Sequence, residues 1–240
     1  MIRGLTIFIF GALFTVYFFF SFGTVEQTSV ILTIATFLFA TFTGFFTARQ
    51  GARYTEIRNE IANFDGHMSA LYRNFTHLGA PAMKKASTII ANHYNAVLKH
   101  GGWDYPFTRK TTTLTDLHTL LGSLKTKASA NVVMVESIEY IINSLQQLQV
   151  SRKKMINLRL ERIPEYQWAL IVVLGLILLL TVSAVPTVHA VIPSILKAAF
   201  GTSILIVIVL LWEFDNLKFF EEGIGRQSAQ DILDILKGKK

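Results

Sequence analysis

The sequence predicts an all-α integral membrane protein, with four transmembrane helices and a cytoplasmic helical bundle formed by extensions of spans two and three. Apolar residues make up 51% of the 240 residues, and the mean hydropathy is +0.43, which is high for a soluble domain. Four stretches are long and apolar enough to cross about 30 Å of hydrocarbon. The polar segment between the second and third stretches has the apolar periodicity of helices.

The four expected spans are Leu5–Phe22, Val30–Thr47, Trp168–Val185 and Val191–Trp212. The first follows Arg3 as a signal peptide would, but it lacks a small-residue cleavage site, so a retained helix is expected. The spans predict a transmembrane hairpin over 1–48, a cytoplasmic helical domain over 49–165, a second hairpin over 166–214 and a cytoplasmic tail over 215–240.

The distribution of charge predicts the orientation. The net charge is +7, and residues 49–165 carry 16 Lys and Arg against 9 Asp and Glu, whereas the two short loops at 23–29 and 186–190 carry almost no charge. The positive-inside rule therefore places both termini and the large polar segment in the cytoplasm. Arginines are not clustered among aromatic residues, so nucleic acid is not an expected partner.

Helices are expected throughout the polar segment. Span two is expected to continue as a helix as far as Leu78. Pro81 interrupts the helical pattern, and a second helix follows over Ala82–His100. Thr115 is expected to cap a short helix. A long helix from about Ala128 enters span three and is expected to pack antiparallel to the extension of span two. The chain ends in a short amphipathic helix.

One helical stripe runs along span two and its extension. Its first half is small and hydroxylated, and its second half, from Ile57 to Leu78, is apolar. The first half consists of Ser29, Thr33, Thr36, Ala40, Thr43 and Thr47. Hydroxyl groups can line an ion pore, but small residues also let membrane helices pack closely, and the stripe alone does not separate these two interpretations. An ideal helix also drifts by about 20° per heptad relative to this repeat.

Two further features bear on conduction. Phe37, Phe42 and Phe46 flank the stripe and would form an apolar constriction in a pore, or face lipid and neighbouring spans otherwise. Lys197 is a cation within span four, where it would attract anions, snorkel to the headgroups or pair with Glu26.

The remaining polar residues do not form a recognisable site. Glu213, Asp215, Glu221 and Glu222 at the end of span four do not match a calcium loop, so interfacial charge is expected there. The histidine pairs His67/His77 and His93/His100 lack the spacing of a metal site, and no metal or cofactor is expected. The chain has no cysteine, which excludes disulfides and thiolate sites. Enzymatic motifs are absent from the sequence, so an enzyme is not expected.

Four groups of residues resemble the bestrophin-like membrane proteins, a family of bacteria and plants. After span two these are Ala52-Arg53, Glu60 and Leu71-Tyr72-Arg73, followed by Tyr94 and Trp103. Arg159-Leu-Glu-Arg-Ile-Pro164 with Trp168 resembles the family's entry into span three. Phe214-Asp215 with Phe219-Phe220-Glu-Glu-Gly223 resembles its exit from span four, although Leu217-Lys218 stands where the family often has a proline before its phenylalanine.

The resemblance implies kinship with bestrophin channels, which are oligomers whose second span lines an ion pore. It implies a homo-oligomer, with five subunits favoured, in a bacterial inner (plasma) membrane, with the lipid bilayer and inorganic ions as partners. The leading hypothesis is therefore an ion channel of undetermined selectivity. The alternative is a non-conducting membrane sensor or scaffold, in which the stripe packs helices and the cytoplasmic bundle recruits a partner.

Overall fold

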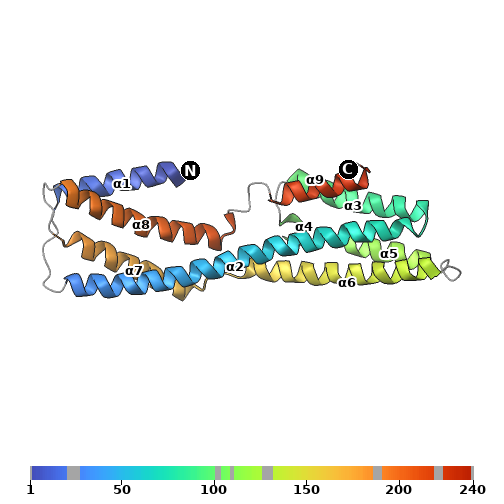
Figure 1. Ribbon diagram of the computed structural model, residues 1–240, viewed down its shortest axis with the longest axis horizontal. Coiled ribbons are helices and arrows are strands. Elements are labelled where there is room, and N and C mark those ends of the chain that lie inside the picture. The colour runs from blue at the N-terminus through green and yellow to red at the C-terminus, as the bar shows by residue number, and fades with distance from the viewer. Residues whose placement is uncertain are drawn as a thin grey trace. The chain divides into compact units, whose positions relative to one another are not determined.

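The computed structural model describes residues 2–20, 28–100, 104–108, 111–125, 132–185, 191–218 and 224–238, and the regular structure within these ranges is helical (Figure 1). The helices are α1 (Ile2–Phe19), α2 (Thr28–Thr76), α3 (Ala80–His100), α4 (Tyr105–Thr108), α5 (Thr113–Lys125), α6 (Val132–Leu160), α7 (Glu165–Ser183), α8 (Val191–Asp215) and α9 (Ile224–Leu236). The chain divides into two compact units. The first unit is Met1–Ala52 with Arg162–Asn216, and the second is Arg53–Glu161 with Leu217–Lys240.

The first unit packs α8 against both α1 and α7 (Figure 1). Gly201 permits this close approach, because a Cβ atom there would lie 3.1 Å from Leu13 Cδ1 on α1 and 3.3 Å from Leu179 Cδ2 on α7. The first part of α2 joins α7 and α8 through a shared apolar core. That core contains Ala35, Phe39, Phe46, Ile163, Ile171, Leu174, Leu178, Ile204 and Leu211.

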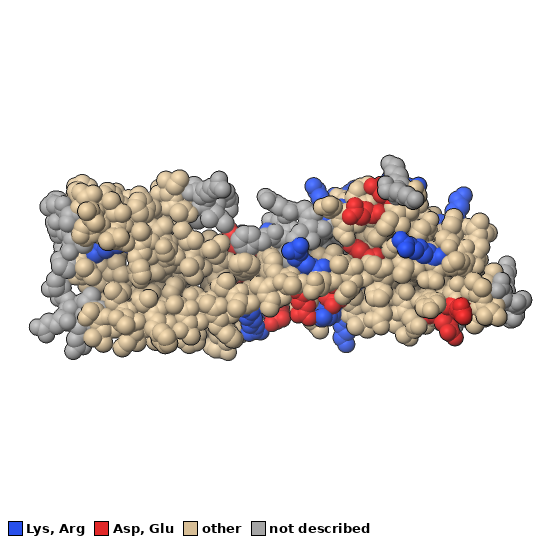
Figure 2. Space-filling view, viewed as in Figure 1, with Lys and Arg blue, Asp and Glu red and all other residues tan. Residues whose placement is uncertain are grey.

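Three helical stretches among the described residues are long and apolar enough to cross a membrane, namely Ser29–Thr76, Val132–Ser183 and Val191–Asp215. The second of these is divided by the non-helical residues 161–164 into α6 and the apolar α7. The apolar part of α1, Thr6–Phe19, is shorter, so the count of four spans stays a prediction. On the face drawn in Figure 2, the surface over α1, α7 and α8 is almost uncharged, whereas charged side chains gather over helices of the second unit.

The second unit is built on an antiparallel pair formed by α2 and α6, as the sequence predicts. Arg53 donates a hydrogen bond to the carbonyl of Leu158, near the end of α6. Glu60 lies further along α2 and accepts a hydrogen bond from Ser151, which lies earlier in α6, so the two helices run in opposite directions. The apolar half of the α2 stripe faces the core of this unit. Its buried members are Ile57, Ile61, Phe64, Met68, Leu71 and Phe75.

The shorter helices cover this pair. α3 packs against α5 and α9, and α9 buries Ala229, Ile232 and Leu233, so the predicted terminal helix belongs to the core. α2 ends at Thr76 and Gly79 turns the chain with a φ of 101°. Pro81 therefore lies in the first turn of α3, where a proline is tolerated, rather than between the helices.

The expected cap at Thr115 is wrong. α5 begins at Thr113, so Thr115 already lies inside the helix. The side-chain hydrogen bond at the start of α5 is made by Thr112, whose hydroxyl donates to the Asp116 carboxylate at 2.8 Å.

Candidate functional site

The hydroxylated stripe of α2 is only partly exposed in the protomer. Ser29, Thr33, Ala40 and Thr47 are exposed. The Thr33 hydroxyl donates to the Ser29 carbonyl at 2.8 Å, which leaves its oxygen lone pairs available to a cation or water outside the helix. This exposed face can therefore present acceptor oxygens and small side chains.

The other members of the stripe turn toward the protomer core. Thr36 is half-buried, and Thr43 is 5% exposed and donates its hydroxyl to the Phe39 carbonyl at 2.6 Å. Every seventh position from Ser29 to Gln50 thus passes from exposed to buried. A straight helix that drifts relative to a seven-residue repeat produces this rotation.

The three phenylalanines next to the stripe also differ. Phe37 is 68% exposed, Phe42 is partly buried against the first unit's core, and Phe46 is 2% exposed within that core. Of the three, Phe37 is the one with a largely exposed ring in the protomer.

Lys197 is buried, and its ammonium group contacts the end of α7. The Nζ atom donates to the carbonyls of Ser183 and Val185, and it lies 5.2 Å from the centroid of the Tyr17 ring. A cation at the C-terminal end of a helix is stabilised by unpaired carbonyls and by the helix dipole. Glu26, one of the partners expected for this cation, lies outside the described residues.

Asp215 ends α8 as a buried hydrogen-bond acceptor. Its Oδ1 accepts from the Ile163 backbone N–H at 2.8 Å and from the Gln50 amide at 3.3 Å, and its Oδ2 accepts from the Trp168 indole N–H at 3.2 Å. The carboxylate therefore joins α2, the start of α7 and α8. Glu213 is half-buried, and Glu221 and Glu222 lie outside the described residues, as do Trp103 and Phe219–Gly223.

Arg53 and Glu60, two of the buried charged residues that α2 contributes to the second unit, both contact α6. Arg53 donates to the carbonyls of Leu158 at 2.7 Å and Arg159 at 3.0 Å, and so caps the end of α6. Burial acts to raise the pKa of the Glu60 carboxyl, but bonds from Lys154 and Ser151 outweigh it, and the pKa is lowered. The sequence carried one signal that these two residues would be buried. They are seven positions apart, and each stands next to a residue of the apolar stripe, on the same side of that stripe.

The histidines do not come together. His93 is buried in the second unit with its Nδ1 3.1 Å from the Thr113 hydroxyl, whereas His77 and His100 are exposed and His67 is half-buried. Among the described residues, three or more His, Cys, Asp or Glu side chains do not gather as a metal site would require.

The sequence matches a known family over most of its length. The sequence model of the bestrophin-like domain matches residues 20–217. No curated protein and no solved structure matches the chain significantly.

Proposed function

The chain belongs to the bestrophin-like family, and from this premise we propose that it forms an oligomeric ion channel. The exposed face of α2, with Ser29, Thr33, Ala40 and Thr47, lines the pore, and Thr36 stands at its edge. The observation that carries the proposal is that this face is small and hydroxylated but is not buried in the protomer. Kinship with bestrophin channels favours five subunits.

Assembly follows from the position of this face. It lies on the outside of a single protomer, so several copies must surround a pore that it lines. Gly44 and Gly51 lie along the same helix, and a Cβ atom at either would have no neighbour within 4 Å. These positions leave room for an ion pathway or for a close approach of α2 helices between subunits.

Residues 28–48 contain no Asp, Glu, Lys or Arg, so a ring of charge does not select the ion within this part of α2. The acceptor oxygen of Thr33 would replace water around a partly dehydrated ion. The resemblance supports a bacterial inner membrane as the proposed location, and the positive-inside rule supports an orientation with both termini and the second unit in the cytoplasm.

Cysteine accessibility tests this proposal cleanly, because the native chain has no cysteine. Single variants Thr33→Cys, Ala40→Cys and Thr47→Cys would be recorded in planar bilayers before and after a charged methanethiosulfonate reagent. Modification at these positions should change the current, with opposite effects of positive and negative reagents. Thr41→Cys is the control, because Thr41 is exposed but lies off the stripe.

A second candidate is a sensor or scaffold that does not conduct. The observation that favours it is a set of exposed apolar side chains on α6 that would suit a protein partner, namely Val132, Val133, Val135, Tyr140 and Val150. Intact oligomers that remain silent across voltage, pH and calcium would reject the channel and favour this candidate.

A further inference from the structure

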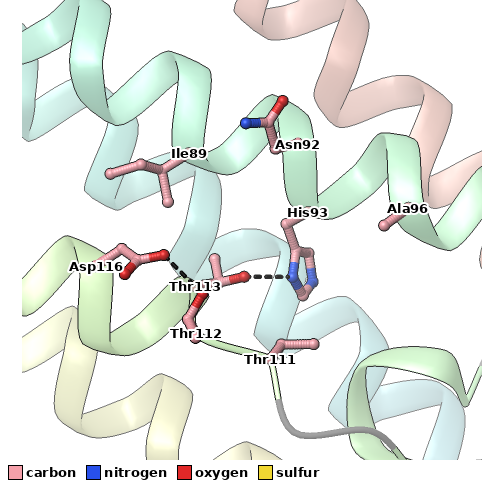
Figure 3. A pocket seen from close by; sticks show the side chains of 8 residues that line it. All are labelled: Ile89, Asn92, His93, Ala96, Thr111, Thr112, Thr113 and Asp116. Carbon is pink, nitrogen blue, oxygen red and sulfur yellow. Dashed lines mark hydrogen bonds between the residues drawn. The ribbon is translucent and has the colours of Figure 1, made fainter.

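A cavity of about 350 Å³ lies between α3 and the start of α5 in the second unit (Figure 3). Asn92 and His93 line it from α3, and Thr111–Thr113 and Asp116 line it from the other side. Its volume falls in the range of small-molecule sites. The residues of the proposed ion pathway belong to the first unit, so binding in this cavity is independent of whether the protein conducts ions.

The walls of this cavity consist mainly of hydrogen-bonding groups. Two internal bonds fix part of the wall, because Thr112 donates to Asp116 at 2.8 Å and the Thr113 hydroxyl lies 3.1 Å from His93 Nδ1. The side chains of Asn92 and Thr111 make no hydrogen bond to another described residue and can serve a ligand. Three consecutive hydroxyls and an amide offer both donors and acceptors.

The charges around the cavity point to an uncharged ligand. Burial, reinforced by the nearby Arg152, lowers the pKa of His93 to about 4, so this ring is neutral near pH 7. Asp116 is then the charged side chain in the lining, and it opposes an anion. Lys84 and Lys85 line an adjoining cavity of about 450 Å³ that shares Ile89, and with Arg152 they oppose a cation.

The composition of the lining disfavours a flat aromatic ligand. His93 provides the aromatic ring in the wall, and that ring already packs against Phe64 and Tyr94, with centroids 5.8 and 5.1 Å away. We infer that the cavity between α3 and α5 binds a small uncharged molecule that carries several hydroxyl groups, of about monosaccharide size.

Three hexoses that differ in charge test this inference on the full-length protein in nanodiscs. D-glucose is neutral, glucosamine is cationic and glucose 6-phosphate is anionic, so the set varies charge on one hydroxylated ring. Saturation-transfer NMR should show saturable binding of glucose at millimolar concentrations, and weaker binding of the two charged sugars. Empty nanodiscs provide the background.

Matched variants locate the binding. Asn92→Ala and Thr112→Val should each weaken glucose binding roughly 3- to 10-fold, since each removes a hydrogen-bonding group from the wall. Asn95→Ala and Thr119→Val, at exposed positions of α3 and α5 outside the lining, should leave it unchanged. Far-UV circular dichroism establishes that all four variants are folded.

Several results would overturn the inference. One is the absence of saturable binding of glucose up to about 100 mM, a concentration well above the millimolar affinity expected of so small a ligand. Another is binding that the folded lining variants and the controls share equally. Tightest binding of glucose 6-phosphate or of glucosamine would reject the charge assignment.

Discussion

The Asp215 carboxylate at the end of α8 accepts a hydrogen bond from the Ile163 backbone N–H at 2.8 Å, across 52 positions of the sequence. Ile163 precedes Pro164, the N-cap residue of α7, so this bond fixes the chain just before an apolar helix starts. The Trp168 indole and the Gln50 amide also donate to this carboxylate. One buried carboxylate thereby holds three segments of the first unit together.

Replacing Asp215 with alanine should destabilise the first unit by about 2–4 kcal/mol, because three donors lose their charged acceptor in a buried site. Asp215→Asn should cost less, since its carbonyl can still accept from Ile163. Glu213→Ala, two residues away and half-buried, is the matched control. Thermal unfolding in detergent would rank the stabilities of the three variants. Equal melting temperatures for Asp215→Ala and Glu213→Ala would contradict the role assigned to the Asp215 carboxylate.

Two positions on α2 should respond oppositely to a bulky residue. Thr43→Trp should impair folding or assembly, because Thr43 is buried against the core and a tryptophan would overpack it. Ala40→Trp, at an exposed position, should leave the fold intact and block the proposed pore. Size-exclusion chromatography reports assembly and bilayer recording reports current, so an intact Ala40→Trp oligomer with native current would reject the pore assignment alone.

Lys197 is expected to stabilise the protein rather than to select ions. Lys197→Met keeps the apolar stem but removes the donor to the Ser183 and Val185 carbonyls, so it should cost about 1–2 kcal/mol. A channel carrying this substitution should keep its reversal potential in asymmetric potassium chloride. A shifted reversal potential without loss of thermal stability would return Lys197 to the ion pathway.

His93 should make the second unit sensitive to mild acid. Burial and Arg152 lower its pKa to about 4, below the usual 6.5, so the unfolded chain binds a proton more readily than the folded one. The stability that neutral His93 preserves is therefore complete above about pH 6.5 and is lost as the pH falls toward 4, by up to about 3 kcal/mol.

Chemical denaturation at pH 7 and pH 4.5 would measure this effect. His93→Gln should lose less stability between the two values than the native protein, and His100→Gln, at an exposed histidine, should behave like the native protein. The Asp65 carboxyl, whose pKa burial raises, contributes in the opposite direction. Comparing the two variants isolates the contribution of His93. If His93→Gln and His100→Gln lose the same free energy of unfolding between pH 7 and pH 4.5, the assigned role of His93 is refuted.

The long α2 helix shows how far the sequence leads. Its apolar stripe from Ile57 to Phe75 was predictable, because the same face meets the core at each turn of the helix. Its hydroxylated half was less so: Ala40 and Thr43 belong to one stripe by spacing, yet one is exposed and the other buried. At 3.6 residues per turn, residues three apart lie about 60° apart around the helix, so these two stand on opposite edges of the stripe, and only the position of the neighbouring helices shows which edge is buried.

Buried polar residues were the least predictable part of the candidate sites. Asp215 and Lys197 were recognised as charged groups near the ends of spans, but their partners are carbonyl, amide and indole groups of ordinary appearance in the sequence. Such partners are set by where two helices cross, and no local pattern records that crossing.

The amino-acid sequence alone specified an all-helical chain, its apolar stretches, the long helix through span two and the bestrophin-like relationship, because hydropathy, periodicity and motif order are properties of short segments. The tertiary structure decided which face of α2 stays open, which carboxylate joins the ends of helices and where a cavity forms beside His93. Those features depend on contacts between residues far apart in the chain, whose geometry exists only once the helices have packed.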